Sequence, residues 1–155
     1  EARGTGSSVS LVIPCKPEYL ALGRLVAGSL GAQQGWDEED ITDLRVVVSE
    51  LSSFFIAPSD ALLVPRSTVS ADSAAASVLR LDFEVEPQAW TFVLSNPDLA
   101  LRLSLETFSD PLSERSLGLT IIRALVDSVD QTDDQTDGTV FRVSKHLAAA
   151  DTPAD

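Results

Sequence analysis

The chain has 155 residues, 44% of them hydrophobic, with eight glycines and eight prolines, which suits one globular domain with an ordinary core. Its formal net charge is −13, from 24 acidic and 11 basic residues, so its surface would repel phosphate backbones and we expect no direct binding to nucleic acid. No run of about 18 apolar residues could cross a membrane, and the opening EARGTGSS lacks the layout of a secretion signal, so we expect a cytoplasmic protein without a membrane partner.

The first predicted elements are a strand and a helix. Residues 8–14 alternate, with Val9, Leu11 and Ile13 on one face, and Pro14 ends the run. Pro17 suits the first turn of a helix that continues to about residue 31. The apolar face predicted for that helix consists of Tyr19, Leu22, Leu25 and Val26. Arg24 lies on the opposite side by helix geometry, so we expect it to point at solvent or at another protein.

A second helix is predicted over residues 38–57, EEDITDLRVVVSELSSFFIA, and the two helices should form a hairpin around Gly35. Its apolar stripe falls at helical spacing on Ile41, Leu44, Val48, Leu51 and Phe55. Glu50 lies beside this stripe, on successive turns with Val47 and Phe54. A carboxylate at the edge of a buried surface is a candidate for chemistry, and a paired structural acid is the alternative.

The remaining pattern is a long loop over 58–77, two alternating strands over 78–86 and 89–95, a helix over 114–128, and a last strand over 139–146 after the Asp137-Gly138 turn. The predicted buried face of the later helix is Leu117, Ile121, Ile122, Leu125 and Val126. We predict one domain over 8–147, with a flexible N-terminus over 1–7 and a disordered tail over 148–155. This order favours an α+β two-layer sandwich: a mixed, mostly antiparallel sheet with helices on one face.

The lone cysteine, Cys15, has no companion residues with metal-site spacing, so no metal centre is predicted.

Two segments resemble a known family. VIPCKPEYLALGRLVAGSLGAQQGW and DEEDITDLRVVVSELSSFFI resemble the first and second helices of anti-sigma factors of the RsbW and SpoIIAB type, members of the GHKL (histidine-kinase-like) ATPase superfamily. The resemblance covers roughly residues 9–147 and implies the Bergerat-type fold. It also implies a homodimer that grips a sigma factor through the helix arginine, which Arg24 matches.

The resemblance further implies a nucleotide pocket, and here the chain departs from the family. The family's general base is matched by Glu50, but the asparagine that helps hold Mg²⁺ and phosphates is replaced by Phe54. Phenylalanine has no oxygen for hard Mg²⁺.

Two further pocket motifs are altered. In D-x-G-x-G, which binds adenine, Asn96 stands for the aspartate and Pro97-Asp98-Leu99 for the glycine-containing part. In G-x-G-L, which presents backbone N–H groups to phosphates, the chain has Ser116-Leu117-Gly118-Leu119.

These patterns predict a partner-switching regulator that binds a sigma factor or an anti-anti-sigma protein through Tyr19, Arg24 and Gly28. Cofactor binding at the degenerate positions Phe54, Asn96, Asp98, Leu117 and Gly118 is expected to be impaired or absent. One alternative is an active serine kinase of an anti-anti-sigma protein, with Mg-ATP as cofactor and Glu50 as base. Another is a scaffold for a different partner.

Overall fold

The structure is a computed structural model that describes residues 6–56, 63–65, 78–96, 99–101, 114–134 and 138–147. The predicted disordered tail and most of the predicted flexible N-terminus lie outside these ranges. The strands and helices in chain order are β1 (Ser7–Pro14), the short 3-10 helix η1 (Pro17–Tyr19), α1 (Leu20–Gln34), α2 (Glu38–Ile56), β2 (Leu63–Pro65), β3 (Val78–Glu86), β4 (Ala89–Asn96), β5 (Leu99–Leu101), α4 (Glu114–Leu125), β6 (Ser128–Asp134) and β7 (Gly138–His146).

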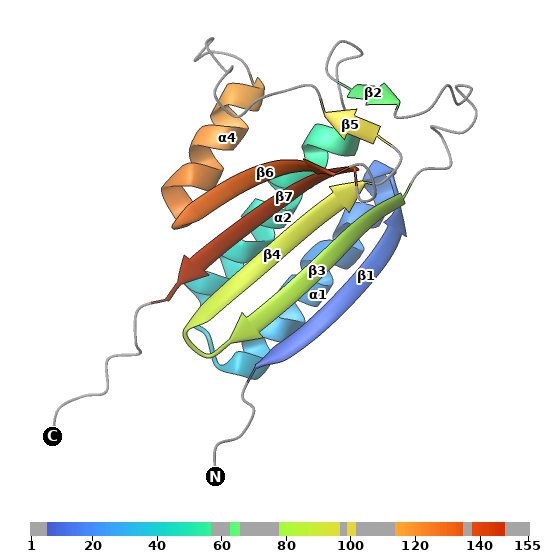
Figure 1. Cartoon of the computed structure of the whole chain (residues 1–155). Coiled ribbons are helices and arrows are strands. Elements are labelled where there is room, and N and C mark those ends of the chain that lie inside the picture. Colours follow the sequence, from blue (N-terminus) through green and yellow to red (C-terminus); the bar gives the residue numbers. More distant parts are fainter. Residues whose placement is uncertain are drawn as a thin grey trace, which may run out of the picture.

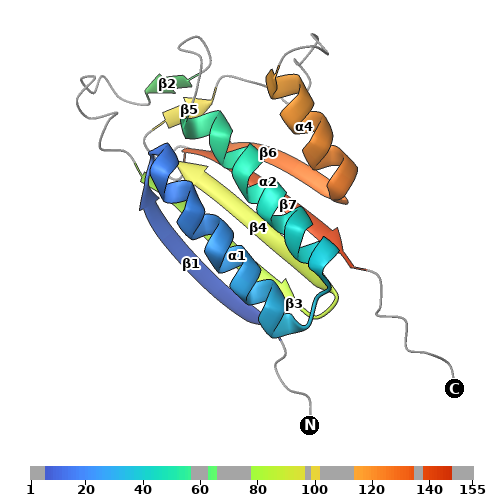
Figure 2. The ribbon, with the colours of Figure 1, turned by 180° about the vertical axis from the view of Figure 1, so that it is seen from behind.

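The main sheet has five strands in the order β1-β3-β4-β7-β6. Each neighbouring pair in it is antiparallel, so the described sheet is fully antiparallel where the sequence predicted a mixed one. Figures 1 and 2 show α1, α2 and α4 on the same face of this sheet, and none of the described helices lies on the other face. The predicted α+β sandwich with helices on one face is therefore confirmed.

The core lies between α2 and the sheet. All five residues of the predicted α2 stripe are buried, because the helix lies over the central strands with that stripe inward. The strands contribute their alternate side chains, as period-2 patterning requires. Those from β3 and β4 are Leu79, Leu81, Phe83, Val85, Trp90, Phe92 and Leu94.

The prediction for the apolar face of α1 is wrong for three of its four residues. Tyr19, Leu22 and Leu25 are exposed, the two leucines at 44% and 66%, whereas Val26 is half-buried and packs against the core. The buried face of α1 consists instead of Gly23, Ala27, Gly28, Leu30 and Gly31. Small residues on this face let α1 approach closely, since a Cβ at Gly23 would stand 3.0 Å from Leu81 Cδ2 and 3.2 Å from Val48 Cγ1. Close packing of the backbone, rather than side-chain bulk, holds this helix.

The predicted face of α4 is wrong in part. Ile122 is buried and Leu125 and Val126 are half-buried, but Leu117 and Ile121 are exposed and Leu119 is buried in their place. The helix is thus rotated from the predicted orientation. The inward side includes Gly118, so α4 also meets α2 through a residue without a side chain.

The region predicted as a long loop contains a short strand. β2 pairs antiparallel with β5, which begins at Leu99, the last residue of the D-x-G-x-G-like segment as matched above. Strands of three residues are too short to show a period-2 pattern, so neither was predicted.

The connection between α1 and α2 follows its predicted chemistry. Gly35 has a φ of 79°, in the left-handed region, and its N–H bonds back to the end of α1. Trp36 follows, buried, and its indole N–H donates to the Glu86 carbonyl oxygen at 2.9 Å. This bond ties the helix hairpin to the end of β3.

Candidate functional site

Glu50 and Phe54 lie one turn apart on the side of α2 that faces α4 and β7. Their placement follows from the core stripe, because a residue about 100° from the buried face of a helix points sideways at the neighbouring element. Glu50 is half-buried and Phe54 is only 3% exposed. The two positions that the resemblance assigned to base and magnesium ligand are therefore adjacent in space, but only Glu50 has a polar group to offer.

Glu50 lies directly against Gly118 of α4. A Cβ at residue 118 would stand 2.8 Å from Glu50 Oε2, closer than side chains approach one another. The structure thus brings together two of the residues predicted for the site. The contact also accounts for a glycine at residue 118 without reference to a nucleotide. A side chain there would clash with the Glu50 carboxylate in its present position.

Gly118 is the fifth residue of α4. Only the first four N–H groups of a helix lack an intrahelical partner, so the N–H of Gly118 falls inside the hydrogen-bond ladder. The G-x-G-L motif was expected at the start of a helix, where free N–H groups could meet phosphates. In this chain the helix begins one turn earlier, at Glu114, so the N–H of Gly118 is not at the helix start.

The Phe54 ring is part of the aromatic core. Its centroid lies 6.2 Å from that of Phe141 on β7, and Phe55 meets the same ring edge-on at 5.8 Å. Such pairs contribute about 0.5–1.5 kcal/mol beyond the burial of their area. Phe54 therefore fills protein interior at the position where the family's asparagine would reach for a metal.

Asn96, which stands for the adenine-binding aspartate, is fully buried at the end of β4. Its Nδ2 lies 3.9 Å from Cys15 Sγ, and that sulfur in turn approaches the Phe55 carbonyl oxygen at 3.5 Å. These contacts join the ends of β1, α2 and β4. Asn96 thus has polar neighbours within the protein.

The remaining predicted pocket positions do not join this group. Leu117 is 52% exposed, on the outer side of α4, and Asp98 lies outside the described residues.

The predicted partner residues lie on α1 and η1. Tyr19 is exposed at the end of η1. Arg24 is exposed, and its Nη1 donates to Ser49 Oγ on α2 at 3.2 Å. It therefore lies along the seam between the two helices rather than on the outermost side of α1.

Gly28 is buried, and the guanidinium of Arg45 lies over it. A Cβ at residue 28 would stand 2.8 Å from Arg45 Nε and 2.9 Å from Cζ. A partner approaching this point would meet Arg45 first. The sequence analysis did not single out Arg45; the signal that finds it is the antiparallel register of the hairpin, in which Arg24 meets Ser49 and Gly28 meets Arg45.

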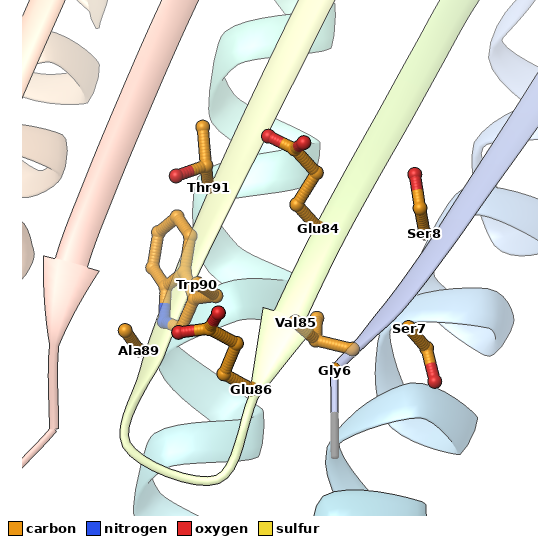
Figure 3. Close-up of a pocket in the computed structure, with 9 residues that line it drawn as sticks. All are labelled: Gly6, Ser7, Ser8, Glu84, Val85, Glu86, Ala89, Trp90 and Thr91. Atoms are coloured by element: carbon orange, nitrogen blue, oxygen red, sulfur yellow. The ribbon is translucent and has the colours of Figure 1, made fainter. Parts of the chain in front are cut away.

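A shallow hollow of about 330 Å³ lies elsewhere, over the ends of β1, β3 and β4 (Figure 3). Ser8, Glu84 and Thr91 are neighbours across these strands and belong to the face opposite the helices. Glu86 adds a second carboxylate. The hollow lies on the other face of the sheet from Glu50, and its two negative charges would repel a phosphate.

Among the residues that the structure describes, no three metal-binding side chains lie close enough together to hold an ion. Within the same ranges, every helix is too short or too polar to cross a bilayer.

Comparison with known proteins agrees with the resemblance. No family model matches the chain. It is similar to the serine-protein kinase RsbW of Bacillus licheniformis, with 29% identity over 130 residues, 78% of this chain and 75% of the relative. It is also similar to RsbW of Bacillus pumilus, with 28% identity over 131 residues, 79% of this chain and 76% of the relative. RsbW of Listeria monocytogenes shares 43% identity over 42 residues, 27% of each chain. The relatives are thus named as RsbW serine-protein kinases, the kind of protein that the two helix segments resemble.

Proposed function

We propose that this chain is a partner-switching regulator of the anti-sigma-factor type with impaired or absent ATP binding. It binds a sigma factor and exchanges it for an anti-anti-sigma protein, using α1 as the capture element. As the resemblance implies, it acts as a homodimer in the cytoplasm.

The observation that carries the proposal is the place of Phe54. The resemblance puts a magnesium-holding asparagine at this position, and Mg²⁺ requires oxygen ligands in near-octahedral geometry. Phe54 offers no oxygen, and its ring is buried against Phe141. Phe54 therefore does not supply the metal contact that the resemblance assigns to this position, which supports impaired binding of Mg-ATP.

The position of Gly118 supports the same conclusion. Its N–H lies within the helix, one turn after the helix begins, so it is not among the N–H groups that a helix N-terminus offers to phosphates.

The test is calorimetric titration of the whole chain with Mg-ATP and with Mg-ADP. We expect no heat of binding in the nanomolar-to-micromolar range. The Bacillus licheniformis RsbW, named a serine-protein kinase, serves as the positive control. Tight binding of either nucleotide by this chain would contradict the loss of the pocket.

Capture is tested separately by titrating purified sigma factors from the source organism. We expect one of them to bind, and Arg24→Glu to abolish binding while the circular dichroism spectrum and unfolding midpoint stay unchanged. Capture at wild-type strength by this variant would remove Arg24 from the proposal. Failure of every sigma factor to bind would favour a scaffold for a different partner.

A second candidate function is an active serine kinase, which the retained Glu50 favours because it stays half-buried beside α4 where the resemblance places a general base. Labelled phosphate transferred from Mg-ATP to an anti-anti-sigma protein, and lost in Glu50→Gln, would establish it. The variant keeps the shape of the side chain and removes only its charge and basicity.

A further inference from the structure

Two arginines follow each other along the outer seam between α1 and α2, which lie side by side in Figure 2. The Arg24 side chain extends from α1 to Ser49 on α2, and the Arg45 side chain extends from α2 to Gly28 on α1. Because the helices form an antiparallel hairpin, these two contacts are one helical turn apart, about 6 Å along the helix axis. The seam therefore presents two guanidinium groups with a defined spacing.

Neither guanidinium meets a carboxylate within the part of the chain that the structure describes. Other cations do: Lys145 lies 3.0 Å from Asp43, Arg80 lies 3.1 Å from Asp82, and Arg142 lies 3.9 Å from Glu84. In a chain with more than twice as many acids as bases, two exposed arginines without acidic partners form a local region of opposite charge. Such a region attracts a negatively charged surface and fixes its register.

Gly28 positions the second of these groups. The Arg45 guanidinium occupies the space that a side chain at residue 28 would fill. Its planar fork therefore lies on the helix surface, where less side-chain entropy is lost when a carboxylate binds. Leu25, three residues before Gly28 on the neighbouring side of α1 and exposed, adds an apolar contact beside the pair.

We propose that this seam binds a helix of the protein partner that carries two carboxylates one turn apart, each pairing with one of Arg24 and Arg45. Carboxylates at i and i+4 on a helix have the spacing of the two guanidiniums, and arginine pairs with a carboxylate through two parallel hydrogen bonds. The identity of the partner as a sigma factor rests on the proposed function; the recognition of paired carboxylates does not.

The first test follows the Nε–Hε signals of Arg24 and Arg45 by NMR in the labelled full chain. The probe is a 20-residue alanine-rich helical peptide with two glutamates at i and i+4, and the matched control carries glutamines there. Both signals should shift with the glutamate peptide and stay in place with the control. Unmoved signals, or equal shifts with a DNA duplex or with anionic vesicles, would overturn the proposal.

The second test measures capture of the sigma factor by Arg45→Ala, Gly28→Ala and Arg142→Ala. Loss of a charge-assisted bidentate pair should weaken binding about tenfold or more in Arg45→Ala. Gly28→Ala should weaken it in the same direction by displacing Arg45. Arg142, an exposed arginine of β7 that pairs with Glu84, is the control and should leave affinity unchanged.

The outcomes separate this inference from the proposed function. If the wild-type chain captures a sigma factor and Arg45→Ala does so equally well, the inference fails while the proposed function stands. If no sigma factor binds, the proposed function fails, and the peptide titration still decides whether the seam recognises paired carboxylates.

Discussion

Glu50 and Gly118 occupy one space between α2 and α4: the Glu50 carboxylate lies where a side chain at residue 118 would have to be. The contact gives a structural reason for a glycine at residue 118, inside a helix. It also predicts how the two positions respond to substitution.

Gly118→Ala should gain little or no stability in the wild-type chain. Alanine is usually better than glycine inside a helix by roughly 0.5–1 kcal/mol, but here the new methyl group must displace Glu50. In a Glu50→Ala background the obstacle is gone, so the same substitution should stabilise the chain by the full amount. Urea unfolding of the wild-type chain, the two single variants and the double variant measures the coupling free energy between the two positions. Effects that add to within about 0.3–0.5 kcal/mol would contradict the contact.

Phe54 should behave as a core residue. Phe54→Ala should lower the free energy of unfolding by about 3–5 kcal/mol, because it removes a ring packed against Phe141 and leaves a cavity. Phe54→Asn should cost at least as much, since its amide would lie among apolar groups. Denaturant titration checks both. An asparagine tolerated at less than about 1 kcal/mol would indicate a polar, accessible pocket at this position.

Gly31→Ala and Gly28→Ala form a matched pair on α1. A methyl group at residue 31 would lie 2.7 Å from Ile41 Cγ1 and 2.8 Å from Trp36 Cε3, both in the core, so we expect a loss of about 1–3 kcal/mol. At residue 28 the obstacle is the end of the exposed Arg45 side chain, which can shift into solvent, so the loss of stability should stay below about 1 kcal/mol. Thermal unfolding compares them. Equal losses would mean that Arg45 is held as firmly as the core.

The Asp40 carboxyl should make stability depend on pH. Burial raises its pKa, and a hydrogen bond with Asp37 adds to the rise, while Lys145 opposes it. A raised folded-state pKa means that the charged form is disfavoured, so this position costs stability as pH rises through its folded pKa. Asp40→Asn should therefore raise the unfolding temperature at neutral pH. The gain should vanish below the ordinary aspartate pKa of about 3.9, and a gain that persists there would contradict the assignment.

Asp127 supplies a control of opposite sign. The backbone N–H of His146 donates to its carboxylate, which lowers the pKa of Asp127. Its stabilising effect is present above the ordinary pKa and is lost as pH falls through the lowered one. Asp127→Asn should therefore reduce the unfolding temperature at neutral pH and have no effect in strong acid.

The fold was predictable where one face of an element is buried. The α2 stripe and the alternation in β3 and β4 each place large apolar side chains inward, and the structure agrees. Most of the buried face of α1 was mispredicted because a periodic pattern of bulky apolar residues does not reveal buried glycines. In this helix Gly23 and Gly31 pack inward, and Leu22 and Leu25 are exposed.

The sequence identified candidate residues of the site, but it did not show which of them lie in contact. Matching residues to a motif identified Glu50 and Gly118 separately, and only the docking of α4 on α2 shows that they exclude each other. Arg45 was missed for a related reason. Its relation to Gly28 depends on the register of two helices, and nothing in either helix alone reports that register.

The buried and exposed sides of α1 differ in what they contribute to the fold. Its buried glycines, Ala27 and Leu30 pack against α2 and the sheet, whereas the exposed Leu22 and Leu25 contribute little to holding the domain together. Substitutions of Leu22 or Leu25 should therefore change the outer surface of the helix with little effect on folding.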